Sequence, residues 1–226
     1  MAQGSLISFE GITCSGKSTL VQRFKDYLLE RGINSDIKQD LKLYHGEGIG
    51  KDIKSLLDKY RTDEYYRFGL PQVETLLILT KRAFESQTRL NPEINKGTII
   101  LADRDIDTVC ALQLVSLKKH NPTLDINKTI ELIRGINGLS SVPPAMTFYL
   151  EVPLNVSADR SLKRDGVKFT NSDYEFNREA LSFYAKVFKV KFDGREVVKI
   201  SSANANADEV FEKARKRFEK WLRNRQ

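Results

Sequence analysis

The spacing G-x-x-x-x-G-K-S/T occurs in the stretch ISFEGITCSGKSTL, residues 7–20, and falls on Gly11, Gly16, Lys17 and Ser18. Glycines let a backbone wrap an anion, and N–H groups at a helix start attract its charge. We expect Lys17 to lie exposed at the rim and bridge terminal phosphates, with the Ser18 hydroxyl on Mg²⁺. A ligand-free glycine turn needs no Lys followed by Ser. The pattern therefore predicts a site for ATP and Mg²⁺ formed by Gly11, Ile12, Thr13, Cys14, Ser15, Gly16, Lys17, Ser18 and Thr19.

A second group of ionic side chains follows an apolar run in IILADRDIDTVCALQ, residues 99–113. Asp103 stands where a carboxylate holds the water shell of Mg²⁺, and Arg104 stands where a cation meets an incoming anion. The structural alternative is an Asp-Arg pair that caps a helix. Because a phosphate loop precedes this pair in the chain, we interpret Asp103 as a metal residue beside Ser18 and Arg104 as an acceptor residue.

A sheet must bring these residues together. Apolar, β-favouring segments alternate with helical patterns, which predicts a three-layer α/β fold: a mostly parallel five-stranded sheet with helices on both faces. The loops that follow the strands are expected to share one rim, where ligands bind. The predicted strands are 6–9, 98–101, 146–152 and 197–200, with a weaker one at 36–39. The predicted helices are 18–30, 49–60, 107–119, 126–135, 155–164 and 174–189, with another opened by Pro71 and a last one capped by Asn206 and Glu209.

Composition bounds the class of protein. The 226 residues, 40% of them hydrophobic, are enough for one core and predict a single domain over 1–226. The net charge of +7 favours anionic partners. The basic run KARKRFEKWLRNR has apolar side chains at helical spacing, which favours the solvated face of a terminal helix over a nucleic-acid site, so no nucleic acid is required. Two cysteines, no signal peptide and no apolar run near ~20 residues predict a cytoplasmic protein without a membrane partner.

The remaining nucleotide-binding classes differ in their other motifs. GTPase switches read guanine with N-K-x-D, whereas residues 127–130 are N-K-T-I, without the Asp. A chain of 226 residues leaves little room for the oligomeric machinery of motors. A small kinase is therefore the favoured class.

The order of motifs resembles the thymidylate kinase family, whose members phosphorylate dTMP. FEGITCSGKST is similar to the family's FEG…GKT/S opening, and VETLLILTKRAFE to the helix that carries its L-x-x-x-R. LADRDIDTVCALQ resembles the DRY/DRH segment, and PPAMTFYLEVPLNVSADRSLKR the PD-x-T-x-x-L-x-V-P segment before a lid. The resemblance runs in order over residues 5–190 and implies a P-loop nucleoside monophosphate kinase that uses ATP and Mg²⁺.

The resemblance also implies roles for single residues. Arg82 and Arg104 match arginines that hold the acceptor nucleotide, and Arg160 and Arg164 match lid-region arginines that reach the donor. Their spacing of four places this last pair on one helix face. The implied set is Lys17, Arg104, Arg160 and Arg164 for catalysis, Ile78, Arg82, Asp103, Arg104 and Gln113 for the acceptor, a lid over about 163–178, and the loop SSANANA, residues 201–207, near the adenine. With the apolar face between Val73 and Phe84, the resemblance further implies a homodimer.

The chain departs from the family pattern mainly where a base would bind. Ile78 replaces a stacking Phe, Leu112 a Tyr that helps exclude ribonucleotides, and Val109 a polar residue at the base edge. Tyr44 or Phe68 are candidates to restore an aromatic contact. Two further departures, Thr13 for the loop Asp and Asp105 for Tyr or His, affect the phosphate end. Two alternatives thus stay open: a kinase for another, modified deoxypyrimidine nucleotide or for a nucleoside, and a nucleotide-binding regulator without catalysis.

Overall fold

A parallel five-stranded sheet forms the centre of the computed structural model, which describes residues 4–41, 44, 46–62, 67–191 and 194–224. Its strands are β1 (Ser5–Glu10), β2 (Ser35–Lys38), β3 (Ile99–Asp103), β4 (Met146–Glu151) and β5 (Glu196–Ser201). Their order is β2-β3-β1-β4-β5, and every neighbouring pair runs parallel. β1 and β3 are buried along their whole length because helices cover both of their faces. All the strand segments predicted from the sequence are confirmed.

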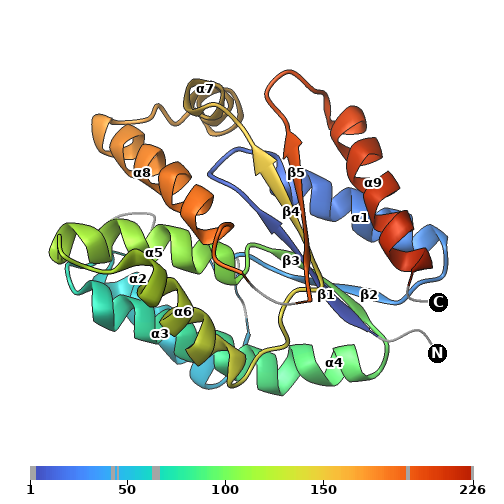
Figure 1. The fold of residues 1–226 in the computed structure, drawn as a ribbon, viewed down its shortest axis with the longest axis horizontal. Helices are drawn as coiled ribbons and strands as arrows, with labels where there is room; N and C mark the ends of the chain where they lie inside the picture. The colour runs from blue at the N-terminus through green and yellow to red at the C-terminus, as the bar shows by residue number, and fades with distance from the viewer. Residues whose placement is uncertain (1–3, 42–43, 45, 63–66, 192–193, 225–226) are drawn as a thin grey trace.

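Helices cover both faces of the sheet, which confirms the three-layer fold (Figure 1). The helices are α1 (Lys17–Glu30), α2 (Ile49–Tyr60), α3 (Pro71–Glu85), α4 (Asn91–Asn95), α5 (Ile106–His120), α6 (Ile126–Gly138), α7 (Leu154–Asp165), α8 (Asn171–Val187) and α9 (Ala207–Arg223). α1 and α9 pack on one face around Phe9, Phe24 and Phe148, whereas α5, α6 and α8 enclose a second core on the other face. Because side chains alternate along a strand, Phe9 faces α1 and the next residue, Glu10, faces α5.

The last helix has the form that its sequence predicts. The Asn206 side chain accepts a hydrogen bond from the Glu209 N–H at 2.9 Å, and the Asn206 N–H donates one to the Glu209 carboxylate at 3.1 Å. Val210, Ala214 and Phe218 are buried on the inner face of α9, while most of its cations face outward. Within the described ranges, no helix has both the length and the apolar character that crossing a membrane requires.

Two segments differ from the predicted pattern. The helix opened by Pro71 does not stop at Glu85: a π-helical stretch, Ser86–Leu90, links it directly to α4. Pro92 lies close to the junction between this stretch and α4. The predicted lid, 163–178, is largely helical, since only residues 166–170 lie between α7 and α8. Gly166, with φ 67°, ends α7 there.

Candidate active site

The loop between β1 and α1 turns back on itself at its two glycines. Gly11 has φ 141° and Gly16 has φ 98°, and a Cβ atom on Gly11 would lie 2.7 Å from the Leu150 carbonyl oxygen. Cys14 also adopts a left-handed conformation, with φ 54°. The loop leads straight into the start of α1, where free N–H groups and the helix dipole favour a bound anion. The strand-loop-helix context expected for the phosphate-binding motif is therefore present.

Lys17 is buried, and the expectation of an exposed side chain is wrong. Its side chain folds back under the loop, where Nζ donates to the Ile12 carbonyl oxygen at 2.8 Å and to Ser15 Oγ at 3.2 Å. Burial, together with the positive charge of Arg104, lowers the pKa of Lys17 to about 7. A phosphate placed in the loop would favour the charged form again, so the cation is poised to pair with an anionic ligand.

The two predicted metal residues meet although 85 positions separate them in the chain. Ser18 Oγ, in the first turn of α1, donates to Asp103 Oδ2, at the end of β3, at 2.5 Å. A hydroxyl and a carboxylate oxygen are the hard ligands that Mg²⁺ accepts, and this ion usually takes its other ligands from water and phosphate. The described residues hold no group of three or more metal-ligating side chains of the His, Cys, Asp and Glu types. The donor set thus fits an ion that is shared with a nucleotide.

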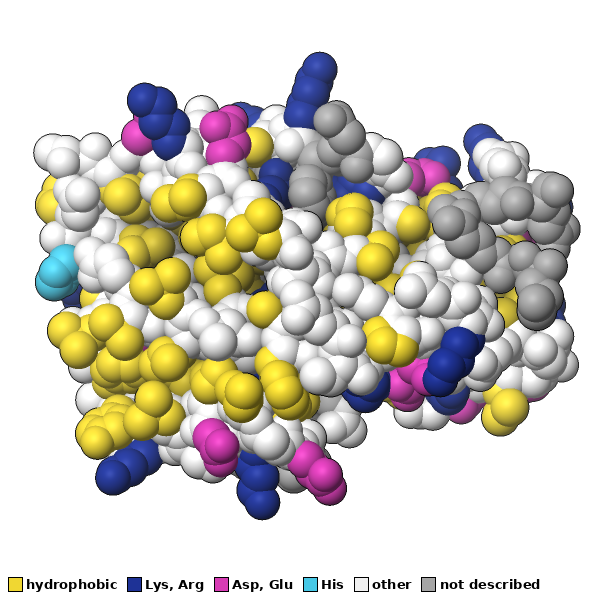
Figure 2. Space-filling model, turned by 90° about the horizontal axis from the view of Figure 1, so that it is seen from below, with side chains coloured by type: hydrophobic (Ala, Val, Ile, Leu, Met, Phe, Trp, Pro, Cys, Tyr) yellow, Lys and Arg dark blue, Asp and Glu magenta, His cyan; other side chains and the backbone are white. Residues whose placement is uncertain are grey.

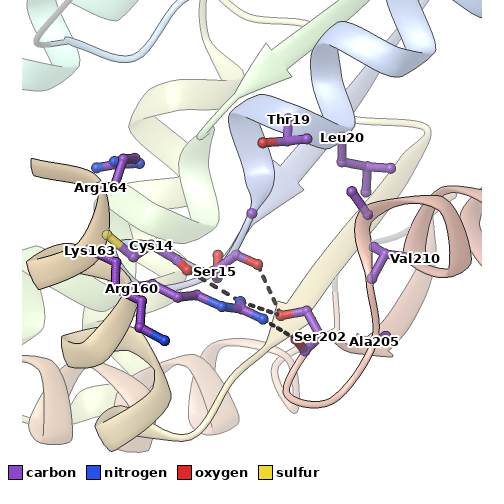
Figure 3. A pocket seen from close by; sticks show the side chains of 12 residues that line it. Cys14, Ser15, Thr19, Leu20, Arg160, Lys163, Arg164, Ser202, Ala205 and Val210 are labelled. Carbon is purple, nitrogen blue, oxygen red and sulfur yellow. Dashed lines mark hydrogen bonds between the residues drawn. The ribbon is translucent and has the colours of Figure 1, made fainter.

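A cavity of about 380 Å³ opens on the α7 and α9 side of the loop (Figure 3). It is lined by Cys14, Ser15, Gly16, Thr19, Leu20, Arg160, Lys163, Arg164, Ser202, Ala205, Ala207 and Val210. Four of the nine residues predicted to bind ATP, Cys14, Ser15, Gly16 and Thr19, line this cavity, and so does part of the loop after β5. The Ile12 side chain packs in the α5 core, and only its carbonyl group belongs to the loop. Thr13, Lys17 and Ser18 do not line this cavity and face a second cavity on the other side of the loop. We refer to the cavity on the α7 and α9 side as the donor cavity.

The two lid-region arginines line the donor cavity but have different partners. Arg160 donates to the Ser202 carbonyl oxygen, and its Nη1 lies 3.4 Å from the Cys14 carbonyl oxygen (Figure 3). Arg164, one turn further along α7, is 63% exposed and pairs with its neighbour Asp165 at 2.6 Å. Arg160 is thus tied to the loop itself, whereas Arg164 lies at the open edge of the cavity.

A second cavity, of about 310 Å³, lies on the other side of the loop, between β3, α3 and α5. All the residues predicted to bind the acceptor line it: Ile78, Arg82, Asp103, Arg104 and Gln113. Cys14 and Arg164 line this cavity as well as the donor cavity, so the two spaces adjoin at these residues. We refer to the second space as the acceptor cavity.

Arg104 is held rigidly at the mouth of the acceptor cavity. Its Nε lies 2.6 Å from Asp40 Oδ2, and its Nη1 donates to the Gly11 carbonyl oxygen at 2.9 Å. Its backbone has φ 68°, and its carbonyl accepts a hydrogen bond from Lys38 Nζ at 2.8 Å. Sequence reasoning missed both Asp40 and Lys38. Neither belongs to a motif, and only the pairing of β2 with β3 brings this strand end to the site.

Arg82 is less free than its predicted role suggests. Its Nε donates to Asn137 Oδ1 at 3.0 Å, and one Nη contacts Asp105 Oδ1. Lys38 Nζ lies 3.9 Å from the same carboxylate oxygen, while Asp105 Oδ2 is buried without a hydrogen-bond partner among the described residues. The departure from Tyr or His at position 105 thus places a carboxylate in the cavity, where it occupies part of the Arg82 guanidinium.

The far end of the acceptor cavity is apolar. Ile78 is 8% exposed, and half-buried Val109 and Phe68 join it in one hydrophobic cluster. Gln113 contributes a polar group there, and its Oε1 accepts a hydrogen bond from Thr75 at 3.1 Å. Tyr44, the other aromatic candidate, lines a separate cavity, and its ring centre lies 3.5 Å from Nζ of Lys81, which lines the acceptor cavity. Phe68 is therefore the aromatic residue that packs beside Ile78.

Glu10 is a buried acid that motif reasoning did not single out. Its Oε1 accepts a hydrogen bond from the Asp105 N–H at 2.9 Å, and its Oε2 contacts Thr108 Oγ1. Thr108 Oγ1 lies 2.6 Å from the Tyr184 hydroxyl, which in turn reaches the Gly11 carbonyl oxygen at 3.3 Å. Burial raises the pKa of Glu10 to about 8, and the nearby carboxylate of Asp107 adds to the shift.

Two cavities that adjoin at a phosphate-binding loop, with a Ser–Asp pair in the wall of the second, define a P-loop phosphotransferase. The family model for thymidylate kinase matches residues 9–214. The chain belongs to the thymidylate kinase family, and it is a nucleotide-binding enzyme of the nucleoside monophosphate kinase class.

Several thymidylate kinases are similar along most of the chain. That of Kosmotoga olearia is 32% identical over 173 residues, which cover 74% of this chain and 75% of that protein. That of Thermoanaerobacter sp. (strain X514) is 27% identical over 190 residues, or 83% and 85% of the two chains. That of Rickettsia bellii (strain RML369-C) is 25% identical over 224 residues, or 96% of each chain. The match over most of both lengths agrees with a resemblance that does not rest on the P-loop alone.

Proposed function

We propose that the protein transfers the γ-phosphoryl group of ATP, in the presence of Mg²⁺, to dTMP. The observation that carries this proposal is the adjoining of the donor and acceptor cavities at Cys14 and Arg164. A phosphoryl group in the loop would lie at this boundary, with an acceptor phosphate held from the other side by Arg104. The names of the curated relatives, all thymidylate kinases, favour dTMP among the monophosphates.

The side chains act by position and charge, because phosphoryl transfer spreads negative charge over the equatorial oxygens and needs no protein nucleophile. Ser18 and Asp103 would hold Mg²⁺, which neutralises charge on the donor phosphates when bound. Lys17 would leave its contact with the Ile12 carbonyl oxygen to pair with a phosphate, and Arg104 would fix the acceptor phosphate. Arg164, exposed at the shared boundary, is the cation best placed to follow the transferred group.

The residues at the base end support dTMP or a close pyrimidine relative with weakened selectivity. Stacking of a base on an aromatic ring is worth about 1 to 3 kcal/mol. Ile78 offers no such face, and Phe68 packs beside it within the same cluster. Leu112, where the family has Tyr, removes the usual guard against a 2′-hydroxyl group. We therefore expect a high KM for dTMP and poor discrimination against dUMP.

One observation favours the alternative of a kinase for another pyrimidine nucleotide. The contact of Arg82 with Asp105 and Asn137 leaves fewer guanidinium donors for a base carbonyl. A modified or amino-bearing pyrimidine would make less use of those donors than thymine. The retained set of Lys17, Ser18 and Arg104 argues against a regulator without catalysis.

We also propose a homodimer formed through α3 and its neighbours. Figure 2 shows hydrophobic side chains gathered on the underside of the molecule. On α3, Val73 is 44% exposed and Leu76 55% exposed, so the face noted in the sequence points away from the protein's own core. Leu132 on α6 is also exposed.

The cytoplasmic location, the absence of a nucleic-acid requirement and the movement of the lid remain predictions.

The test of the function is kcat/KM measured side by side for dTMP, dUMP, UMP, dCMP, dGMP, dAMP and the corresponding nucleosides. We expect dTMP or a close pyrimidine monophosphate to lead, with dUMP close behind. A preference for dTMP over dUMP by about four orders of magnitude would contradict the weakened base end. A preference for a purine would refute the dTMP assignment and leave the kinase class standing.

Lys17→Ala provides the matching test of the donor site. The variant should fold, as judged by circular dichroism, and lose most of its kcat, because preorganised charge on a transferring phosphate is worth several kcal/mol. Activity within a few-fold of the parent with the best acceptor would refute the assignment of the loop as the ATP site.

A further inference from the structure

Five consecutive carbonyl groups of the phosphate-binding loop each accept a hydrogen bond from a side chain. The donors come from separate parts of the fold. The carbonyl of Gly11 is bonded by Arg104, that of Ile12 by Lys17, that of Thr13 by Ser157, that of Cys14 by Arg160, and that of Ser15 by Ser202. The carbonyl groups of the loop are thus held by side chains from the start of α1, the loop after β3, α7 and the loop after β5.

Two of these donors are small, buried hydroxyl groups to which the sequence analysis assigned no role of their own. Ser157 is 0% exposed in the first turn of α7, and its Oγ donates to the Thr13 carbonyl oxygen at 2.6 Å. Ser202 is 3% exposed just after β5, and its Oγ donates to the Ser15 carbonyl oxygen at 2.9 Å. Figure 3 shows Ser202 joined by dashed lines to Ser15 and to the Arg160 guanidinium.

The direction of a carbonyl group fixes the direction of the next N–H group, because a trans peptide is planar and its two polar bonds point in opposite directions. A donor behind the Thr13 carbonyl oxygen therefore turns the Cys14 N–H toward the opposite side. The Ser202 hydroxyl has the same effect on the N–H of Gly16. Anions bind to such loops through N–H groups that are already aligned, so hydroxyls that hold the carbonyls reduce the cost of ordering the loop around a phosphate.

We propose that Ser157 and Ser202 are positioning residues that hold the phosphate-binding loop in its anion-binding conformation, from α7 and from the loop after β5 respectively. The proposal rests on the donor site assigned above, and it acts through the loop backbone. Ser157 does not line the donor cavity, whereas Ser202 does, so Ser157 tests the effect of the backbone by itself. It also assigns Arg160 in part to the loop, since this guanidinium joins the Cys14 carbonyl oxygen to Ser202.

The test is the affinity for MgADP, measured by calorimetry on Ser157→Ala, Ser202→Ala and the double variant. MgADP needs no phosphoryl acceptor, so the result does not depend on which monophosphate the enzyme uses. Loss of one hydrogen bond to a carbonyl should weaken binding about two- to ten-fold in each single variant. The double variant should be weaker than either one. Measured well below the unfolding temperature, the affinity reports on the folded protein and is insensitive to a loss of stability alone.

Ser161→Ala is the matched control. Ser161 lies one turn after Ser157 on α7 and is 3% exposed, and within the described part of the chain it makes no hydrogen bond to the loop. Its variant should bind MgADP within two-fold of the parent. If Ser157→Ala and Ser202→Ala, both folded, also bind within two-fold while Lys17→Ala loses binding, the proposal is wrong and the donor site stands.

The outcome separates this proposal from the proposed function. A parent protein that binds MgADP but phosphorylates no member of the substrate panel would refute the kinase reaction, and the serine variants would still decide the role of the two hydroxyls. A parent protein that binds no nucleoside diphosphate would overturn both. Should one single variant fail to fold, the other variant carries the test, because each hydroxyl holds a different carbonyl.

Discussion

Replacing Arg104 with Gln should mainly weaken binding of the acceptor monophosphate. The Arg104 guanidinium is 17% exposed, and Asp40 and the Gly11 carbonyl oxygen fix it at the mouth of the acceptor cavity. Gln keeps a planar group with hydrogen-bonding atoms, but it is shorter and carries no charge to meet a phosphate. The change therefore removes the charge-assisted contact together with the ties to Asp40 and Gly11.

The size of the effect follows from the type of contact. A hydrogen bond to a charged group contributes about 1.5 to 3 kcal/mol, which corresponds to roughly ten-fold to more than a hundred-fold in acceptor affinity. The cost in stability should be smaller, about 1 kcal/mol, because Asp40 is 22% exposed and keeps access to water. Gly11 also keeps its second contact, with the Tyr184 hydroxyl at 3.3 Å.

Arg164→Gln is the matched variant on the other side of the boundary. Arg164 is 63% exposed and pairs with Asp165, so its loss should leave acceptor affinity within about two-fold and slow the transfer step. Calorimetric titration with dTMP, followed by single-turnover kinetics with ATP, separates the two effects. Unchanged acceptor affinity in Arg104→Gln would refute the reasoning and place the acceptor phosphate elsewhere.

Two further predictions concern pH dependence and assembly. Burial and the carboxylate of Asp107 raise the pKa of Glu10 from its ordinary value of 4.5 to about 8 in the folded state. Between these two pH values the folded protein keeps the Glu10 proton, whereas the unfolded chain has lost it. The contribution of this proton to the free energy of unfolding is therefore lost as the pH rises from 4.5 through 8. Urea unfolding at pH 5 and pH 8 should show Glu10→Gln losing less stability than the parent over this range, by at least about 1 kcal/mol. Lys17 titrates in both proteins, and its lowered pKa comes mainly from burial and Arg104, with only a minor opposing effect of the Glu10 charge. Equal losses would contradict a protonated Glu10. Leu76→Glu, which places a charge on the exposed face of α3, should convert a dimer into a monomer in analytical ultracentrifugation. The control is Leu29→Glu, at an exposed position of α1, which should leave the dimer intact. An identical mass for the parent and Leu76→Glu would place the interface elsewhere.

The sequence by itself determined the parts of this protein that depend on local order. Apolar, β-favouring segments and helical patterns predicted every strand and most helices, because a short buried strand and an amphipathic helix need different arrangements of apolar residues. The spacing of Gly16, Lys17 and Ser18 predicted the phosphate loop, because the loop and the helix that it enters are continuous in the chain. The order of the remaining motifs predicted the family that the comparison with its model confirms.

Only the tertiary structure decided the contacts between residues far apart in the chain. Asp40 reaches Arg104 because β2 pairs with β3, and Ser157 and Ser202 reach the phosphate loop because parallel strands bring their following loops to one rim. The burial of Lys17 could not be predicted from the sequence either, because the exposure of a side chain depends on what packs over it and not on its motif. The spacing of residues along the chain identifies the side chains of a motif, whereas strand order and helix packing determine which residues hold those side chains in place.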